Sequence, residues 1–144
     1  MKLDCYQKID PIVIEAAKQV AMVHPDLIIW ACTLGSIIPD QNGLSIGNKI
    51  ENSTGIPTVT AAQAVIEYMR SKSIKRIALY TPYTETFTRI LTNFLNKHVE
   101  DLVIEEEFSQ GIVEGYKKGQ ITDESLVTSM LELCTGLNHI DGLF

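Results

Sequence analysis

The sequence lacks the long apolar segment, the basic runs and the cysteine framework that mark three common protein classes. No unbroken apolar stretch approaches the roughly 18 residues of a membrane span, and the N-terminus has no apolar signal-peptide core. No run of lysine or arginine exceeds two residues, which argues against nucleic-acid binding. The three cysteines are too few and too scattered for a disulfide framework.

What the chain does contain is typical of one globular protein. Its 144 residues are 45% hydrophobic and 21% charged, close to the average for folded domains. The count of lysine and arginine is 12 and that of aspartate and glutamate is 18, which leaves a net charge of −6. These values predict a soluble, acidic, cytoplasmic protein that binds neither nucleic acid nor a membrane.

Segments of helical periodicity alternate with short apolar runs. The run Leu27–Cys32 (LIIWAC) is typical of a strand buried on both faces of a parallel sheet. The other expected strands are residues 56–60, 75–80, 102–108 and 139–144, and the expected helices are residues 11–23, 45–52, 61–71, 84–97 and 123–133. Loops are expected at 35–42 and 110–120, and Thr60 and Asp123 as helix caps. Strands separated by helices predict an α/β fold of parallel βαβ units in a doubly wound sheet.

In such a sheet, chemistry lies beyond the carboxyl ends of the strands, and Cys32 is the strongest candidate by this rule. It ends the 27–32 strand and is followed by Thr33, Leu34 and Gly35. Backbone N–H groups in a turn of this kind stabilise an anion and so favour the thiolate. The alternative is a buried, inert cysteine, which is common in protein cores.

The second candidate is the turn Thr81-Pro82-Tyr83, which follows the 75–80 strand. Pro82 would fix the turn, and Tyr83 would present a hydroxyl that donates to a carboxylate or acts as an acid. The alternative is a tyrosine that only packs at the start of a helix, which is the more frequent case.

Other polar residues give weaker signals. Cys5 and Cys134 are expected to be structural, and no Cys/His spacing indicates a metal site. Three consecutive glutamates at 105–107 are expected to form a solvated strand end. The glycines at 111–119 do not follow a strand with dinucleotide-binding spacing. The histidines are expected at element ends facing solvent: His24, His98 and His139.

The stretches Ala31–Thr33, Gly55–Pro57 and Arg76–Tyr83, in this order and spacing, resemble one known superfamily. It is the aspartate/glutamate racemase superfamily, in the branch of maleate cis-trans isomerases and arylmalonate decarboxylases. Its members are similar two-halved α/β proteins with pseudo-two-fold symmetry, and they use neither a cofactor nor a metal. The resemblance implies that residues 1–73 and 74–144 are parts of two such half-domains.

The resemblance also implies roles for the candidate residues. Cys32 matches the catalytic cysteine of the first half, and Tyr83 matches a tyrosine that binds a substrate carboxylate. Thr33 and Leu34 match positions whose hydroxyl or backbone amide holds a carboxylate, and the turn at Thr81-Pro82 would supply further donors. Decarboxylases of this branch carry glycine at the first cysteine position. Cys32 therefore favours a cofactor-independent isomerase of a small dicarboxylate, of the maleate-to-fumarate type, whose thiolate adds to the double bond.

Two features of the superfamily are not found in the chain. They are an N-terminal strand and the cysteine of the other half, which would follow directly on the strand matching residues 139–144. Cys134 cannot replace that cysteine, because it falls in the preceding helix. The expectation is therefore an incomplete enzyme, weakly active or inactive as this chain, that associates into a homodimer or a higher homo-oligomer.

Three other interpretations stay open. Amino-acid racemases and decarboxylases of the same superfamily are similar in layout, and a racemase removes a proton on one face of its substrate and returns it on the other. A binding module of this fold without catalytic activity is the second. The third is an unrelated doubly wound domain such as a signalling receiver, which the lack of an acidic cluster at the expected strand ends disfavours.

Overall fold

A computed structural model describes residues 5–6, 8–39 and 45–144. The chain divides into two compact units, one built by residues up to Tyr68 and the other by Met69–Phe144. We call them the N-terminal and C-terminal units. Each contains parallel strands separated by helices, so the predicted α/β fold with parallel strands is confirmed. Within the described residues, no helix is both long and apolar enough to cross a lipid bilayer.

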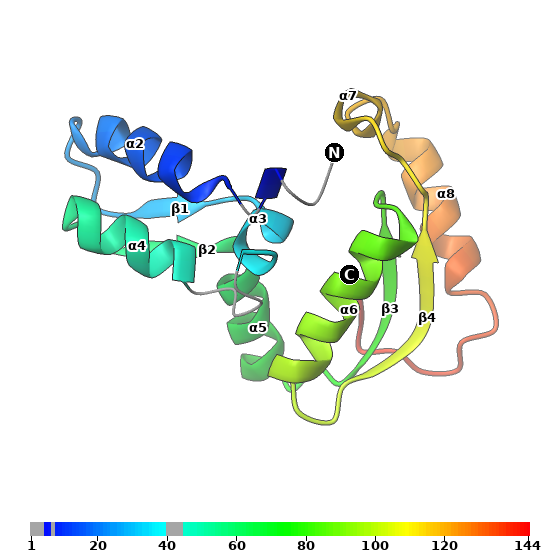
Figure 1. Ribbon diagram of the computed structural model, residues 1–144. Helices are drawn as coiled ribbons and strands as arrows, with labels where there is room; N and C mark the ends of the chain where they lie inside the picture. The colour runs from blue at the N-terminus through cyan, green and yellow to red at the C-terminus, as the bar shows by residue number, and fades with distance from the viewer. Residues whose placement is uncertain (1–4, 7, 40–44) are drawn as a thin grey trace. The chain divides into compact units, whose positions relative to one another are not determined.

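The N-terminal unit pairs two short parallel strands. Its elements are α2 (Asp10–Ala21), β1 (Ile28–Trp30), α3 (Thr33–Ile37), α4 (Ser45–Thr54), β2 (Thr58–Thr60) and the larger part of α5 (Ala61–Ser71). β1 and β2 run side by side, with Ile28 opposite Thr58 and Trp30 opposite Thr60 (Figure 1). The two strands therefore end at the same edge of the sheet, and Cys32 follows β1 at that edge.

The core of the N-terminal unit lies between α2, α4 and β1. Val13 and Ala17 lie one turn apart on α2, and Ile46 and Ile50 lie one turn apart on α4. All four side chains pack in one buried cluster with Ile28 of β1. This spacing places the apolar side chains of each helix on a single face, which is the pattern of a helix that covers a sheet.

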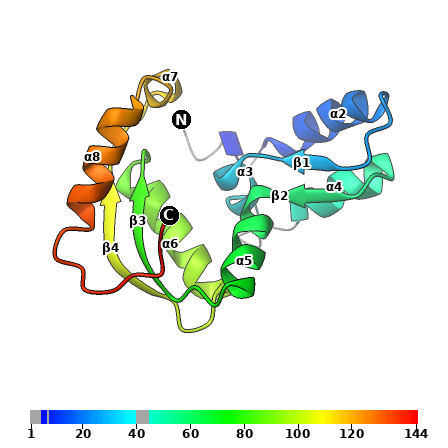
Figure 2. The ribbon, with the colours of Figure 1, turned by 180° about the vertical axis from the view of Figure 1, so that it is seen from behind.

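The C-terminal unit holds a three-stranded parallel sheet in the order β4-β3-β5. Its elements are β3 (Arg76–Thr81), α6 (Glu85–His98), β4 (Val103–Ser109), α7 (Gly115–Lys118), α8 (Asp123–Leu133) and β5 (Gly142–Leu143). α6 lies in front of this sheet and α8 behind it in Figure 1, and the view from behind in Figure 2 shows the reverse order. Helices on both faces are what a doubly wound arrangement requires.

β3 is the central strand and is buried on both faces. Ile77, Ala78 and Leu79 are at most 2% exposed. From α6, Leu91 and Leu95 are also almost fully buried and lie one turn apart on the helix. A continuous apolar strand flanked by helices explains why residues 75–80 read as a buried strand in the sequence.

β5 is shorter than the expected strand at 139–144. Its start is held by Asp141, whose carboxylate accepts the backbone N–H groups of Lys75 and Arg76, each at 2.8 Å. These two hydrogen bonds hold the pKa of Asp141 below its usual value of 3.8, and the bond from Lys75 has the larger effect. A single carboxylate thus ties the chain before β5 to the first residues of β3.

Short helices replace parts of the two expected loops. The loop expected at 35–42 is wrong in its first residues, because α3 covers Thr33–Ile37; residues 40–42 lie outside the described residues. The loop expected at 110–120 is interrupted by α7 (Gly115–Lys118). Helices of four or five residues are too short to show an apolar periodicity, so a pattern search passes over them.

The two expected helix caps have different outcomes. Thr60 caps α5 as expected, because its hydroxyl accepts the N–H of Gln63 at 3.1 Å. The cap of α8 is Thr122, whose hydroxyl accepts the N–H of Ser125 at 3.2 Å, so the assignment of Asp123 as the cap is wrong. Asp123 is instead the first helical residue, where a carboxylate interacts favourably with the helix dipole.

Candidate active site

The strand order of the C-terminal unit indicates where a ligand would bind. The chain passes from β3 to β4 on one side, and then crosses to β5 on the other side of β3. In open α/β sheets, ligands bind outside the carboxyl ends of the strands where the chain changes direction in this way. In this unit that place is the end of β3, where Thr81 leads into Pro82 and Tyr83.

In the N-terminal unit, Cys32 is the residue that caps α3. Its backbone is extended, with φ −124° and ψ 100°, and its sulfur accepts the N–H of Gly35 at 3.4 Å. Its carbonyl oxygen accepts both the N–H of Ser36 at 2.9 Å and the Ser36 hydroxyl at 2.8 Å. The partly buried sulfur therefore lies at the amino end of a helical turn, beside the backbone N–H of Gly35.

Gly35 allows this close contact between the backbone and the sulfur. A Cβ atom at this position would lie 2.9 Å from Cys32 Sγ and 3.0 Å from Trp30 Cζ2. Both distances are shorter than ordinary carbon contacts, so a side chain at Gly35 would push the sulfur or the indole away. Glycine is therefore required here by the space beside the sulfur.

Thr33 and Leu34 occupy the first turn of α3 together with Cys32. Thr33 is partly exposed, so its hydroxyl can reach a ligand, whereas the Leu34 side chain is 1% exposed and belongs to the core. Leu34 can therefore offer a ligand only its backbone. The first N–H groups of a helix have no acceptor within the helix, which is why such turns bind anions.

In the C-terminal unit, a network of hydroxyl groups holds the turn Thr81-Pro82-Tyr83. The Thr81 side chain is 2% exposed, and its hydroxyl lies 2.6 Å from that of Thr88 on α6. The Ser109 hydroxyl, at the end of β4, donates to Thr88 at 2.8 Å. The N–H of Tyr83 in turn donates to Thr81 Oγ1 at 3.4 Å. Thr81 thus orients the backbone of Tyr83.

The segment after β4 also belongs to this edge of the sheet, which the sequence analysis did not foresee. Gly111 N–H donates to the Tyr83 carbonyl at 2.8 Å, and Ile112 N–H donates to the Pro82 carbonyl at 3.2 Å. The ammonium of Lys118, on α7, lies 4.5 Å from the centroid of the Tyr83 ring. The sequence did contain one indication of this segment, which is that a predicted strand ends near Ser109. Ligands bind beyond the carboxyl ends of parallel strands, and this applies to that strand as well.

The structure therefore groups the predicted residues into two sets. Cys32, Thr33 and Leu34 lie together in the N-terminal unit, and the turn 81–83 lies in the C-terminal unit. Cys134 is the C-terminal cap residue of α8, and Cys5 is exposed. Among the residues that the structure describes, no three His, Cys, Asp or Glu side chains cluster as metal ligands would.

The histidines also differ from one another. His24 and His139 are exposed as expected. His98 is partly buried, and its ring lies 4.6 Å from that of Phe94, so the expectation that it faces solvent is wrong. Residues 94 and 98 lie one turn apart on α6, which brings the two rings together.

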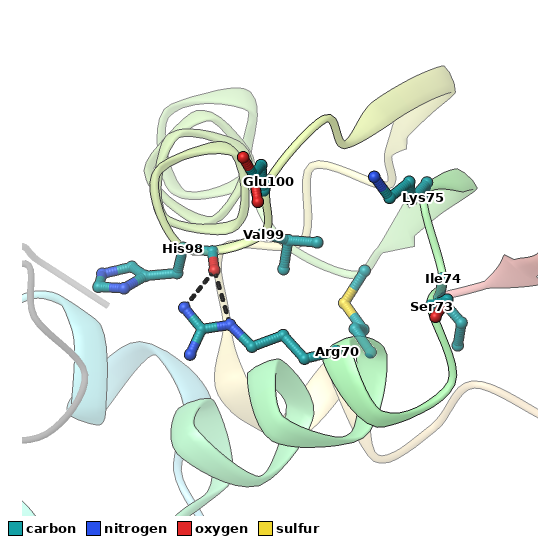
Figure 3. A pocket seen from close by; sticks show the side chains of 8 residues that line it. Arg70, Ser73, Ile74, Lys75, His98, Val99 and Glu100 are labelled. Atoms are coloured by element: carbon teal, nitrogen blue, oxygen red, sulfur yellow. Dashed lines mark hydrogen bonds between the residues drawn. The ribbon is translucent and has the colours of Figure 1, made fainter.

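A surface cavity of about 350 Å³ lies at the other end of the C-terminal sheet, where β3 begins (Figure 3). Arg70 lies along it and donates from Nε and Nη2 to the His98 carbonyl, at 3.1 and 2.6 Å. Lys75 is ion-paired with Asp101 at 3.0 Å. The cavity thus lies away from the strand ends that carry the candidate residues. Its lining residues are Met69, Arg70, Ser73, Ile74, Lys75, His98, Val99 and Glu100.

Comparison with known proteins places the sequence in one family. Residues 1–144 match the family model described as arylmalonate decarboxylase. No curated protein matches the sequence.

Solved structures share the fold at low sequence identity. A glycine-to-cysteine variant of arylmalonate decarboxylase is 22% identical with a TM-score of 0.79, over 96% of this chain and 59% of that one. The maleate isomerase of Pseudomonas putida, solved with maleate in one of its forms, is 17% identical with a TM-score of 0.85, over 99% and 58%. The maleate cis-trans isomerase of Nocardia farcinica, solved as a cysteine-to-serine variant with a covalently bound succinylcysteine intermediate, is 18% identical with a TM-score of 0.79, over 91% and 54%. This chain thus spans less than two thirds of the length of these proteins.

Proposed function

Because the chain belongs to the arylmalonate decarboxylase family, we propose that it is a cofactor-independent isomerase of a small dicarboxylate, of the maleate-to-fumarate type. Its membership confirms the branch that the sequence resembles. The observation that carries the proposal is Cys32, whose sulfur caps α3 and accepts the N–H of Gly35 at 3.4 Å. A cysteine sulfur held in a fixed position at the start of a helix is suited to attack a polarised double bond as a nucleophile.

The proposed reaction uses the Cys32 sulfur as a nucleophile that is regenerated. The thiolate adds to one carbon of the double bond, a carbon–sulfur bond forms, and the electron pair moves to the other carbon, where it is conjugated with a carboxylate. The central bond is then single and rotates. Expulsion of the thiolate restores the double bond in the trans arrangement. The thiolate consumed in the first step is regenerated in the last, so the isomerisation needs no further reagent.

The remaining candidates are proposed to bind carboxylates. At α3, the Thr33 hydroxyl and the backbone N–H groups of Thr33 and Leu34 are donors suited to one carboxylate. At the end of β3, the Tyr83 hydroxyl is the donor, and Thr81 and Pro82 fix the turn that presents it. Preorganised donors of this kind stabilise the negative charge that the addition step places on the conjugated carboxylate.

Decarboxylation is the second candidate function, because the family model is that of a decarboxylase. In that reaction a malonate-type substrate loses one carboxylate as carbon dioxide, and an acid protonates the carbanion that remains. The thiol of Cys32 would be that acid instead of a nucleophile. The two functions therefore differ in whether a carbon–sulfur bond forms at Cys32.

Covalent capture tests the proposal without requiring turnover. The chain is incubated with maleate at neutral pH and digested, and the cysteine peptides are analysed by mass spectrometry. We expect a succinyl adduct on Cys32, formed when a proton from water quenches the carbanion before the thiolate is expelled. We expect none on Cys5, which is exposed, or on Cys134, which is the C-terminal cap residue of α8, because neither sulfur is held as that of Cys32 is. The Cys32→Ser variant should form no adduct, and the Cys134→Ser variant should behave as the unaltered chain.

Two outcomes would count against the isomerase. An adduct spread equally over the three cysteines, or one that persists in Cys32→Ser, would reject the assigned nucleophile. Carbon dioxide release from an arylmalonate without any adduct from maleate would favour the decarboxylase. In that case Cys32 would act as the acid that protonates the carbanion. Carbon dioxide release should then be lost in the Cys32→Ser variant.

A further inference from the structure

A positively charged side chain lies against the tyrosine of the candidate site. The ammonium of Lys118 is 4.5 Å from the centroid of the Tyr83 ring, within the range of a cation–π contact. Lys118 is partly buried, whereas its neighbour Lys117 is exposed and pairs with Glu114 at 3.2 Å. The two lysines of α7 therefore have different surroundings, and it is Lys118 that turns toward Tyr83.

Backbone hydrogen bonds hold the segment that leads to α7 beside the turn that carries Tyr83. The loop after β4 is joined to the turn after β3 by the hydrogen bonds from Gly111 to Tyr83 and from Ile112 to Pro82. α7 follows that loop at the carboxyl end of β4 (Figure 1). The position of Lys118 over the ring thus follows from main-chain contacts of the C-terminal unit.

We infer that Lys118 is a specificity-determining residue that recognises the negative charge of the carboxylate bound by Tyr83. The inference rests on the proposed function, because it assumes that Tyr83 binds a carboxylate. It adds a residue that neither the strand-end rule nor the superfamily resemblance assigned. It also names the ligand class, which is a small dianion in preference to a monoanion.

Charge makes this role necessary. The residues assigned to carboxylate binding offer hydroxyl and backbone N–H donors, all of which are neutral: Thr33, Leu34 and Tyr83, the last in the turn that Thr81 and Pro82 fix. The chain as a whole carries a net charge of −6, which repels a dianion. A cation close to one donor offsets that repulsion locally, and its effect doubles with the charge of the ligand. Lys118 would therefore contribute more to the binding of a dianion than of a monoanion.

The test compares two probes on the unaltered chain and four variants, one of which is Tyr83→Phe. Maleate, a dianion at neutral pH, and crotonate, a monoanion, are titrated separately, and binding is followed by the amide resonances of Tyr83 and Gly111 in NMR spectra. Lys118→Gln should weaken maleate binding about three- to thirtyfold, and crotonate binding less. Lys118→Arg should restore most of the affinity for maleate. Lys117→Gln is the matched control and should change neither affinity.

The outcomes separate this inference from the proposed function. Maleate binding that is unchanged in Lys118→Gln but weakened in Tyr83→Phe would overturn the inference and leave the carboxylate site in place. Equal losses for maleate and crotonate, or no binding of maleate to the unaltered chain, would also overturn it. Lys118-dependent binding without any adduct at Cys32 would support the inference and count against the proposed chemistry.

Discussion

Replacing Gly35 with alanine should slow the reaction of Cys32 with alkylating reagents. The added Cβ would lie 2.9 Å from the Cys32 sulfur and 3.0 Å from Trp30 Cζ2, which is too close for either atom to stay in place. The sulfur would have to move away from the Gly35 N–H, which donates to it at 3.4 Å. The sulfur would then lose its hydrogen bond to the backbone and the position that this bond fixes.

The size of the effect follows from the geometry of that hydrogen bond. Hydrogen bonds to charged groups contribute about 1.5–3 kcal/mol, but sulfur is a weaker acceptor than oxygen, so we take about 1 kcal/mol for the 3.4 Å hydrogen bond from Gly35. This corresponds to about a fivefold slower reaction at Cys32, because 1.4 kcal/mol is a factor of ten. Overpacking beside the sulfur should also lower the free energy of unfolding, by about 1–3 kcal/mol.

The assay is the rate of iodoacetamide alkylation at neutral pH, resolved by mass spectrometry so that Cys134 serves as the internal reference. Gly47→Ala is the matched control, because its Cβ would lie 3.0 Å from the Thr60 methyl group, in the same unit but away from the sulfur. Gly47→Ala should destabilise the chain comparably and leave the rate at Cys32 unchanged. Equal rates at Cys32 in the Gly35→Ala variant and the unaltered chain, or equal slowing by both variants, would refute the reasoning.

Two further predictions concern the stability and the association of the chain. The pKa of Asp141 is lowered by the N–H groups of Lys75 and Arg76, so its stabilising contribution is present above its ordinary pKa of 3.8 and is lost as the pH falls through the lower folded value. Asp141→Asn should therefore unfold at a lower urea concentration than the unaltered chain at neutral pH, and this difference should vanish in strong acid; a pH-independent difference would contradict the assignment. The chain should associate at micromolar concentration, because β1 exposes Ile29 to 63% and β4 and β5 are outer strands of the described sheet. A monomeric mass by light scattering would be the contrary result.

Local signals in the sequence were enough to predict the longer helices. The helix expected at 61–71 is α5 (Ala61–Ser71), because a capping threonine and an apolar face act together over three turns. The strands are shorter than the apolar runs that predicted them, as for β1 (Ile28–Trp30) within residues 27–32. An apolar run indicates which residues are expected to be buried. Buried residues continue beyond those that form hydrogen bonds in the sheet, so the run is longer than the strand.

Contacts between distant residues could not be found in the same way. Lys118 lies over Tyr83 because two backbone hydrogen bonds hold the loop after β4 beside the turn after β3. Neither a periodicity nor a motif reports such a contact, since it depends on the order of the strands in the sheet. The division of the chain near Tyr68, within α5, has no local signal either, because the helical pattern continues across it, and the expected division after residue 73 came from the superfamily resemblance.

The position of Cys32 also decides how its chemistry can be tested cleanly. The residue has two separable roles, since its sulfur accepts the Gly35 N–H as a helix cap and its thiolate is the proposed nucleophile. Serine is among the preferred residues at the cap position, so Cys32→Ser should keep α3 while removing the nucleophile. Cys32→Ala would remove both and should cost about 1 kcal/mol of unfolding free energy. A loss of adduct formation in Cys32→Ser at unchanged stability would therefore be a loss of chemistry, and not of the fold that holds it.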